Sequence, residues 1–217
     1  MQKDQPSPGS DSLSLGALIL GAGRSVRMGT LKLLLPWRHT SILGHLILQC
    51  QMLGAAQVAI VIANEALELC RELDRLGFSR ETRIVNDTPE RGMFSSIQCA
   101  AGWDGWSASL THWLVLLGDQ PHLQRGTLRE LIDFAAQNSQ KVCQPLRKSR
   151  WCHPVLLPKE IFCQLPSSKA STLREFLVGC ERAGFESRDP GLEKDIDTPE
   201  DYKNALNAMS AGNSIVE

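Results

Sequence analysis

A short stretch rich in glycine and basic residues has the composition of an anion-binding loop. It spans residues 21–29, Gly-Ala-Gly-Arg-Ser-Val-Arg-Met-Gly, and Lys32 follows after two further residues. Small residues let a backbone approach a ligand closely, and the N–H groups of such a bend can cradle an anion. Arg24, Arg27 and Lys32 bring three cations within nine residues. This combination favours a polyphosphate ligand, although a βα turn with solvated basic residues explains the glycines and cations about equally well.

Two known phosphate-binding patterns do not fit this stretch. A dinucleotide-binding fingerprint requires glycine at position 26, which is Val26. A P-loop requires a lysine after Gly29, which is followed by Thr30. Any phosphate site here is therefore of another kind.

Three aspartates have positions that suit a divalent cation. Asp119 follows the apolar run 112–118, so its carboxylate is expected at the carboxyl edge of a sheet, where Mg²⁺ could bridge it to phosphate oxygens. Asp195 and Asp197 are two residues apart, which places both carboxylates on one side of an extended segment. One of this pair could complete the metal site. The alternatives are that Asp119 only bounds a turn and that Asp197 only supports the start of the last helix.

Four further polar residues are candidates for substrate contacts. His153 opens an apolar run and suits either a substrate contact or a structural role. Ser95 and Ser96 could cap a helix that begins near Ile97 or contact a nucleotide, and the two roles are compatible because helix N-termini attract anions. Asn86 ends a predicted strand and could contact a base or ribose, but turn chemistry explains it equally well.

Alternating strands and helices would position these residues. Short apolar runs predict strands at 16–20, 57–63, 82–85, 112–118 and 141–145, with a sixth at 154–158. Apolar residues at helical spacing predict intervening helices, one with Ile42, Leu43, Leu46, Ile47 and Cys50 on one face and another with Leu128, Leu131, Ile132 and Ala135. The alternation indicates right-handed βαβ crossovers and a mostly parallel sheet with helices on both faces. Ligands of such sheets bind beyond the carboxyl ends of the strands.

The last helix carries start signals of its own. Thr198 is a suitable N-cap, Pro199 suits the first helical position, and Glu200 and Asp201 are acids in the first turn. No internal repeat or interdomain linker is evident, so we expect a single domain at 13–210. Residues 1–12 are expected to form a disordered tail and 211–217 a flexible C-terminus.

The composition argues against several partners. The chain has 217 residues and a formal net charge of -1, whereas nucleic-acid and membrane-surface binders carry a large excess of Lys and Arg. No window approaches the roughly 18 apolar residues of a membrane span, and the first residues lack the apolar stretch of a signal peptide. The seven cysteines include no CxxC pair and fit reduced thiols. We expect a cytoplasmic protein that binds neither nucleic acid nor membranes.

The loop and several later motifs together resemble one family. Residues 20–36 have the pattern L-G-A-G-R-S-V-R-M-G-x-x-K-L-L-L-P, which is similar to the signature loop L-A-A-G-x-S-x-R-M-G-x-x-K-L-L-L-P of the MobA-like nucleotidyltransferases. The resemblance continues from residue 18 to about 206, through Asn86, Gly92 to Ile97, Gly118 to Pro121, His153 to Leu157 and Asp195 to Asp201. It is most similar to the molybdenum cofactor cytidylyltransferase branch.

The resemblance implies a fold, a reaction and a set of site residues. The fold is a three-layer α/β/α Rossmann-like nucleotidyltransferase fold with a mostly parallel, mixed sheet. The reaction is Mg²⁺-dependent transfer of CMP from CTP to molybdopterin-bound molybdenum, and a molybdoenzyme could receive the product. Arg27, Lys32 and Asp119 would be catalytic, and Mg²⁺ would bind Asp119 with Asp195 or Asp197. His153 would face the acceptor. The nucleotide would contact Leu20, Gly21, Ala22, Gly23, Arg24, Ser25, Lys32, Asn86 and Ser96.

Two departures from the family pattern leave alternatives open. Gly21 replaces an alanine whose methyl is expected to shape the base pocket, and Cys152 replaces the glycine before His153. Ala22 favours cytidylyl over guanylyl transfer, because guanylyl-transferring relatives have glycine there. The rivals are guanylyl transfer, a transferase acting on a sugar phosphate, a methylerythritol phosphate or a lactyl phosphate, and a non-catalytic carrier of nucleotide or molybdopterin.

Overall fold

The computed structural model describes residues 13–23 and 28–213, and only the backbone of 210–213. The N-terminal tail expected at 1–12 lies outside the described residues, as do Arg24, Ser25 and Arg27 of the predicted anion loop.

One mixed sheet forms the centre of the described chain. Its strands follow the order β10-β7-β9-β6-β1-β4-β5, and β8 pairs with β7 beside this path. Strand β9 is antiparallel to both β6 and β7, and the other pairs along the path are parallel. The predicted mostly parallel, mixed sheet is therefore confirmed. The strands are β1 (Leu15–Leu20), β4 (Gln57–Ala63), β5 (Arg83–Asn86), β6 (His112–Leu117), β7 (Val142–Arg147), β8 (Arg150–Trp151), β9 (Val155–Pro158) and β10 (Arg182–Glu186), with a separate pair formed by β2 (Pro36–Trp37) and β3 (Thr40–Ser41).

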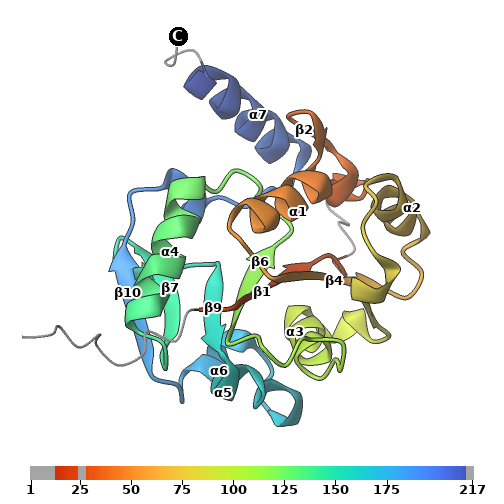
Figure 1. Cartoon of the computed structure of the whole chain (residues 1–217). Coiled ribbons are helices and arrows are strands. Elements are labelled where there is room, and N and C mark those ends of the chain that lie inside the picture. Colours follow the sequence, from red (N-terminus) through yellow and green to blue (C-terminus); the bar gives the residue numbers. More distant parts are fainter. Residues whose placement is uncertain (1–12, 24–27, 214–217) are drawn as a thin grey trace, which may run out of the picture.

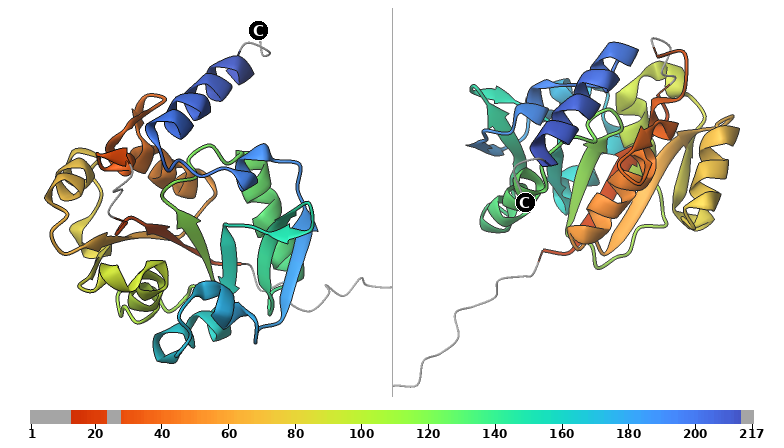
Figure 2. Two further views of the ribbon diagram at one scale, coloured as in Figure 1. Left: turned by 180° about the vertical axis from the view of Figure 1, so that it is seen from behind. Right: turned by 90° about the horizontal axis from the view of Figure 1, so that it is seen from above.

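Helices cover both faces of the sheet, as Figures 1 and 2 show. In β1, Ala17 and Ile19 pack into one core cluster with residues of α1, α2 and α4, whereas Leu18 packs into a second cluster with residues of α3, α5 and α6. Successive side chains of a strand point to opposite faces, so a fully apolar strand needs a helical layer on each side. The α-helices are α1 (Ile42–Met52), α2 (Leu67–Arg75), α3 (Met93–Ala101), α4 (Arg125–Gln137), α5 (Lys159–Phe162), α6 (Leu173–Leu177) and α7 (Pro199–Asn213). The 3-10 turns are η2 (Lys32–Leu34), η3 (Arg80–Thr82), η4 (Pro89–Arg91), η5 (Leu165–Ser167) and η6 (Pro190–Glu193).

The predicted helix faces and the last helix are confirmed. The apolar faces expected within α1 and α4 are buried. At the start of α7, the Thr198 hydroxyl accepts from Asp201 N at 3.2 Å, and the Asp201 carboxylate accepts from Thr198 N at 2.8 Å. This reciprocal pair satisfies N–H groups that a helix start leaves without helical partners. The helix continues to Asn213. The flexible C-terminus expected from 211 stays a prediction.

Strands β8 and β10 were not predicted from the sequence. Residues 182–186 are Arg-Ala-Gly-Phe-Glu, and none of them is fully buried. Strand β10 is the first in the strand order and pairs only with β7 along this path. An edge strand of this kind is not covered on both faces and sides, so its sequence lacks the apolar run of an interior strand.

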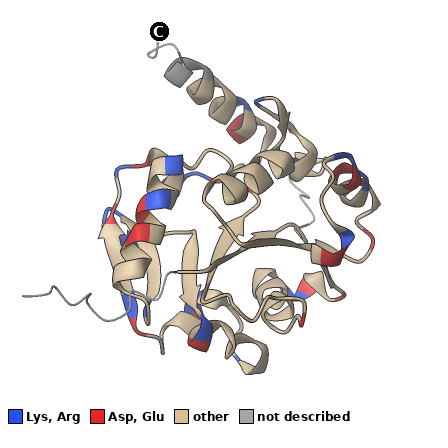
Figure 3. Ribbon diagram, viewed as in Figure 1, with Lys and Arg blue, Asp and Glu red and all other residues tan. Residues whose placement is uncertain are grey.

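Charged residues of both signs are interspersed on the surface, for example along α4 in Figure 3. Among residues 13–23 and 28–213, no helix combines the length and the apolar character needed to span a bilayer.

Candidate active site

The carboxyl ends of β1 and β6 are neighbours and open into a cavity of about 340 Å³. The two strands pair in parallel, so the residues that follow Leu20 and Leu117 come together at one edge of the sheet. Seven of the predicted site residues line this cavity: Leu20, Gly21, Ala22, Gly23, Lys32, Ser96 and Asp119. The first turn of α3 also borders it, through Gly92 and Met93.

Little space is left for a side chain where these strand ends converge. A Cβ at Gly118 would lie 2.9 Å from the carbonyl oxygen of Leu20 and 2.9 Å from Leu33 Cδ2. A Cβ at Gly21 would lie 3.0 Å from both Ile60 Cδ1 and the carbonyl oxygen of Val61. A methyl at position 21 would thus press on these two atoms and would also lie 3.2 Å from Leu33 Cδ1, a side chain that lines the cavity. The expectation that this methyl shapes the base pocket stays a prediction.

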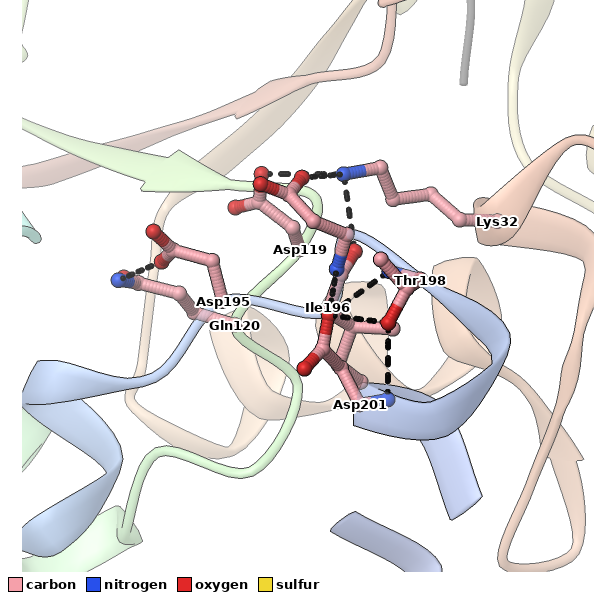
Figure 4. Close-up of polar contacts among 8 residues, drawn as sticks. Lys32, Asp119, Gln120, Asp195, Ile196, Thr198 and Asp201 are labelled. Carbon is pink, nitrogen blue, oxygen red and sulfur yellow. Dashed lines mark hydrogen bonds and ion pairs between the residues drawn. The ribbon is translucent and has the colours of Figure 1, made fainter. Parts of the chain in front are cut away.

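Lys32 lines the cavity and joins two acidic segments, whose polar contacts Figure 4 shows. Its Nζ donates to Asp119 Oδ2 at 3.1 Å, to Asp197 Oδ1 at 3.2 Å and to the carbonyl oxygen of Ile196 at 3.0 Å. The Lys32 side chain is only 15% exposed, and those of Asp119 and Asp197 are 25% and 33% exposed. A cation is thus held in a partly desolvated position where its field is screened less than at the surface.

Asp195 lies beside this group but has a different hydrogen-bond partner. Gln120 Nε2 donates to Asp195 Oδ1 at 2.8 Å. Burial raises the pKa of Asp195, and the charges of Asp119 and Asp197 raise it further, against the opposing effects of Gln120 and Lys32. The carboxylates of Asp195 and Asp197 therefore act on each other electrostatically, but Asp197 is the one that shares Lys32 with Asp119.

The acids fit a site for a divalent cation. Asp119 Oδ1 is buried and has no hydrogen-bond partner within the described residues, so it is an oxygen that a cation could use. Asp119 Oδ2 and Asp197 Oδ1 both lie near one nitrogen, so both carboxylates can reach a common cation. In the described part of the chain, no group of three or more His, Cys, Asp or Glu residues could hold a metal alone. Mg²⁺ commonly binds through one or two carboxylates together with substrate phosphates.

A buried aspartate, Asp189, fixes the segment that carries Asp195 and Asp197. Asp189 is 3% exposed, and its carboxylate accepts from Gln124 N at 2.8 Å, Thr127 Oγ1 at 2.9 Å and Gly191 N at 2.8 Å. Ile196 N donates to the carbonyl oxygen of Asp119 at 2.9 Å. These bonds tie residues 189–197 to the loop between β6 and α4. Sequence reasoning missed Asp189, because its side-chain partners outside its own turn are more than 60 residues away.

Asn86 and the two serines that follow it form one hydrogen-bonded group beside the cavity. Asn86 is 3% exposed, does not line the cavity, and donates from Nδ2 to both Ser95 Oγ and Ser96 Oγ at 2.9 Å. Asn86 therefore orients Ser96 from the interior, and contact between Asn86 and the nucleotide stays a prediction. Helix α3 begins at Met93 rather than near Ile97, so the two serines lie in its first turn and do not cap it.

His153 lies near the acids but not in the cavity lining. Burial lowers its pKa to about 4, and the charge of Asp119 acts in the opposite direction. Its Nδ1 is buried without a hydrogen-bond partner among the described residues. Contact between His153 and an acceptor stays a prediction.

Comparison with known proteins places this geometry in a family. A model described as the MobA-like NTP transferase domain matches residues 17–183. The chain belongs to this family. MobA-like proteins are nucleotidyltransferases, and the matched span includes the β1 end, Lys32, α3 and Asp119, whereas Asp189, Asp195 and Asp197 lie beyond it.

Individual relatives agree with this membership. Molybdenum cofactor cytidylyltransferase of Escherichia coli (strain K12) is 25% identical over 190 residues, which are 87% of this chain and 94% of the relative. Rv0371c from Mycobacterium tuberculosis H37Rv has a crystal structure with a TM-score of 0.69 and 24% identity, covering 90% of this chain and 98% of its own. Its complex with manganese gives a TM-score of 0.66 at 21% identity, with the same coverage. Molybdopterin-guanine dinucleotide biosynthesis protein A from Archaeoglobus fulgidus gives a TM-score of 0.67 at 13% identity, covering 90% and 99%. The structural matches establish the nucleotidyltransferase fold.

Proposed function

We propose that this chain transfers CMP from CTP to molybdopterin-bound molybdenum and releases pyrophosphate. The family membership and the E. coli relative support the reaction, and Ala22 favours cytidylyl over guanylyl transfer. The observation that carries the proposal is the position of Lys32, whose ammonium lies between Asp119 and Asp197 beside a cavity lined by residues 20–23.

The cavity suits a nucleoside triphosphate. Apolar side chains such as Leu20, Leu33 and Met93 line one part of it, where a flat base and ribose would be shielded from water. The backbone of 21–23 and the first turn of α3 border the same space, and helix N-termini favour anions. The triphosphate would therefore lie along these N–H groups and end near Lys32. Arg24, Ser25 and Arg27 remain proposed contributors from the same loop.

The chemistry requires positioning and charge neutralisation more than a protein nucleophile. A phosphate oxygen of the acceptor forms a bond to the α-phosphorus of CTP, while the bond from that phosphorus to the α,β-bridging oxygen breaks and pyrophosphate leaves with the electron pair. An acceptor phosphate is already ionised at neutral pH, so no general base is needed. Lys32 would neutralise the charge that develops on the phosphoryl oxygens and orient the α-phosphate.

The acids complete the electrostatics of this step. Asp119 and Asp197 would hold Mg²⁺, which when bound supplies further charge neutralisation at the phosphates. Gln120 donates a hydrogen bond to Asp195, so this carboxylate is held by Gln120 rather than by Lys32. Asp189 and the Ile196 backbone hold the whole segment against the end of β6.

Incubation of the protein with Mg-CTP and extracted molybdenum cofactor, followed by mass measurement of the products, tests the proposal. We expect a molybdopterin cytosine dinucleotide and one pyrophosphate for each CMP transferred. Parallel incubations with GTP and ATP should give much less product. Absence of both dinucleotide and pyrophosphate with CTP would contradict the proposal and favour a carrier role.

A further inference from the structure

The first turn of α7 directly follows the segment that carries the acids. The helix begins at Pro199, two residues after Asp197. Its first turn contains two acids, Glu200 and Asp201, and both suit this position because a helix N-terminus attracts negative charge. Glu200 is exposed, whereas Asp201 is half-buried. The two neighbouring acids therefore have the same charge but different surroundings.

The Asp201 carboxylate holds the backbone that precedes the helix. Its Oδ2 accepts from Asp197 N at 3.2 Å, from Thr198 N at 2.8 Å and from Thr198 Oγ1 at 2.7 Å (Figure 4). Thr198 Oγ1 in turn accepts from Asp201 N at 3.2 Å. Hydrogen bonds to an ionised carboxylate are stronger than those between neutral groups. Asp201 therefore fixes two successive backbone N–H groups, one of which belongs to Asp197.

A single peptide group connects Asp201 with Lys32. The carbonyl of Ile196 and the N–H of Asp197 belong to one planar unit and point in opposite directions. Lys32 Nζ donates to this carbonyl oxygen at 3.0 Å, and the N–H donates to Asp201. A cation at the carbonyl and an anion at the N–H polarise the peptide in the same sense, so each hydrogen bond strengthens the other. The peptide before Asp197 is thus held at both ends.

The start of α7 is itself fixed to the segment that carries Lys32. The Tyr202 hydroxyl donates to the carbonyl oxygen of Pro36, four residues after Lys32. Tyr202 and Ala205 also pack against the core cluster that includes residues of α1. Asp201 therefore acts from a helix end whose position relative to Lys32 is set by independent contacts.

The position of this backbone decides where the Asp197 carboxylate lies. An aspartate has one methylene between its backbone and its carboxylate, so a rotation of the peptide displaces the carboxylate oxygens. Asp197 Oδ1 lies 3.2 Å from Lys32 Nζ, which also bonds Asp119. A functional site of this kind requires its groups to be held within about 0.5 Å of the working geometry.

Resting on the proposed function, we propose that Asp201 is a positioning residue for the divalent cation. It holds the N–H of Asp197 and thereby keeps the Asp197 carboxylate where it can share a cation with Asp119. Asp201 does not line the nucleotide cavity, so it acts through Asp197 and not on the nucleotide. Residues that orient metal ligands change metal affinity by about 10- to 100-fold when they are removed.

Binding of Mn²⁺ to the protein without nucleotide, measured by electron paramagnetic resonance of the free ion, tests this inference. The dissociation constant should rise about 10-fold in Asp201→Ala. In Asp201→Asn it should stay within about threefold of the wild type, because the amide oxygen still accepts from the Asp197 N–H. Glu200→Ala, which removes an equal charge from the same turn, is the matched control and should bind as the wild type does. Weaker binding in all three variants would assign the effect to charge and overturn the positioning role.

Titration of the rate of pyrophosphate release with Mg²⁺ gives a second readout. Asp201→Ala should require about 10-fold more Mg²⁺ for half-maximal rate. At saturating Mg²⁺ its kcat and its KM for CTP should approach the wild-type values, because excess metal restores occupancy of the site. A kcat that stays low at every Mg²⁺ concentration would indicate a general structural defect and contradict the inference.

Amide hydrogen exchange of the wild type covers the case in which Asp201→Ala folds poorly. The Asp197 amide should exchange more slowly than in an unstructured peptide of the same sequence, because its N–H donates to Asp201. An unprotected Asp197 amide, absence of Mn²⁺ binding to the wild type, or unchanged Mn²⁺ binding in Asp201→Ala overturns the inference while leaving cytidylyl transfer intact. A wild type that forms no dinucleotide overturns the proposed function, whereas the Mn²⁺ comparison among the variants still decides the role of Asp201.

Discussion

The two sides of the site are built in different ways. The nucleotide side comprises residues 20–23, 32–33 and 89–96 together with Gly118. It is shaped by backbone and small residues, and a Cβ at Gly118 would lie 2.9 Å from a carbonyl oxygen. The acid side comprises residues 187–198, and it is held by side-chain hydrogen bonds to the loop after β6. Lys32 extends from the first side to the second.

This difference predicts how each side responds to substitution. A side defined by backbone conformation tolerates changes that preserve small residues. A side defined by buried hydrogen bonds loses its geometry when one acceptor is removed, because the partners are left unsatisfied in the interior. The following substitutions test this contrast, beginning with the residue that connects the two sides.

Lys32→Ala should have the largest effect. It removes the cation that faces the phosphates and leaves Asp119 and Asp197 without the ammonium between them. We expect the rate of pyrophosphate release from Mg-CTP and acceptor to fall by on the order of 10²- to 10³-fold, as when one oxyanion donor is lost. Lys169→Ala, at an exposed lysine, is the control. Full activity of Lys32→Ala would show that the reaction does not need the Lys32 cation between the nucleotide and the acids.

Asp197→Asn and Asp195→Asn distinguish the two neighbouring acids. Asp197 shares Lys32 with Asp119, whereas Asp195 bonds Gln120, so Asp197→Asn should raise the Mg²⁺ concentration required for half-maximal rate more strongly. For Asp195→Asn we expect a change of about 10-fold, typical of a residue that orients metal ligands. Titration of the rate with Mg²⁺ measures both. The reverse order would assign the metal to Asp195.

Asp189→Asn should weaken the hydrogen bonds that hold the acid side in place, at a residue that is not expected to contact substrate. An amide in this position turns an N–H toward the donors Gln124 N, Thr127 Oγ1 or Gly191 N, so at least one buried partner is lost. The free energy of unfolding should fall by about 1 to 3 kcal/mol. In the fraction that remains folded, kcat should decrease while the KM for CTP stays near the wild-type value. Asp133→Asn, at an exposed residue of α4, should change neither quantity.

Gly21→Ala should have the smallest effect and concerns the nucleotide side. The added methyl would press on Ile60 and the Val61 carbonyl, so we expect the free energy of unfolding to fall by about 1 kcal/mol. The ratio of kcat/KM for CTP to that for GTP should change by less than about threefold, under about 0.7 kcal/mol. A large gain in preference for CTP would mean that position 21 contacts the base after all.

The strands and the loop that frame the nucleotide side could be predicted from the sequence, whereas the contacts that hold the acid side in place could not, and the contrast above explains why. The β1 loop is one continuous motif, and buried strands such as 16–20 and 112–118 are apolar on both faces, so local sequence carries the information. Strand β10 and Asp189 depend on partners far along the chain, and their own residues give no periodic signal. Asn86 was expected at the ligand because it ends a strand, yet three-dimensional packing directs its amide to Ser95 and Ser96.

The central claim is that the β1 end and Lys32 hold a nucleoside triphosphate opposite Asp119 and Asp197. A crystal structure of the protein with CTP and Mg²⁺ tests it most directly. We expect the cytidine in the 340 Å³ cavity, the triphosphate along residues 21–23 and near Lys32, and the metal on Asp119 and Asp197. A cavity without nucleotide at saturating CTP, or an Asp119 turned away from the bound phosphates, would contradict the account.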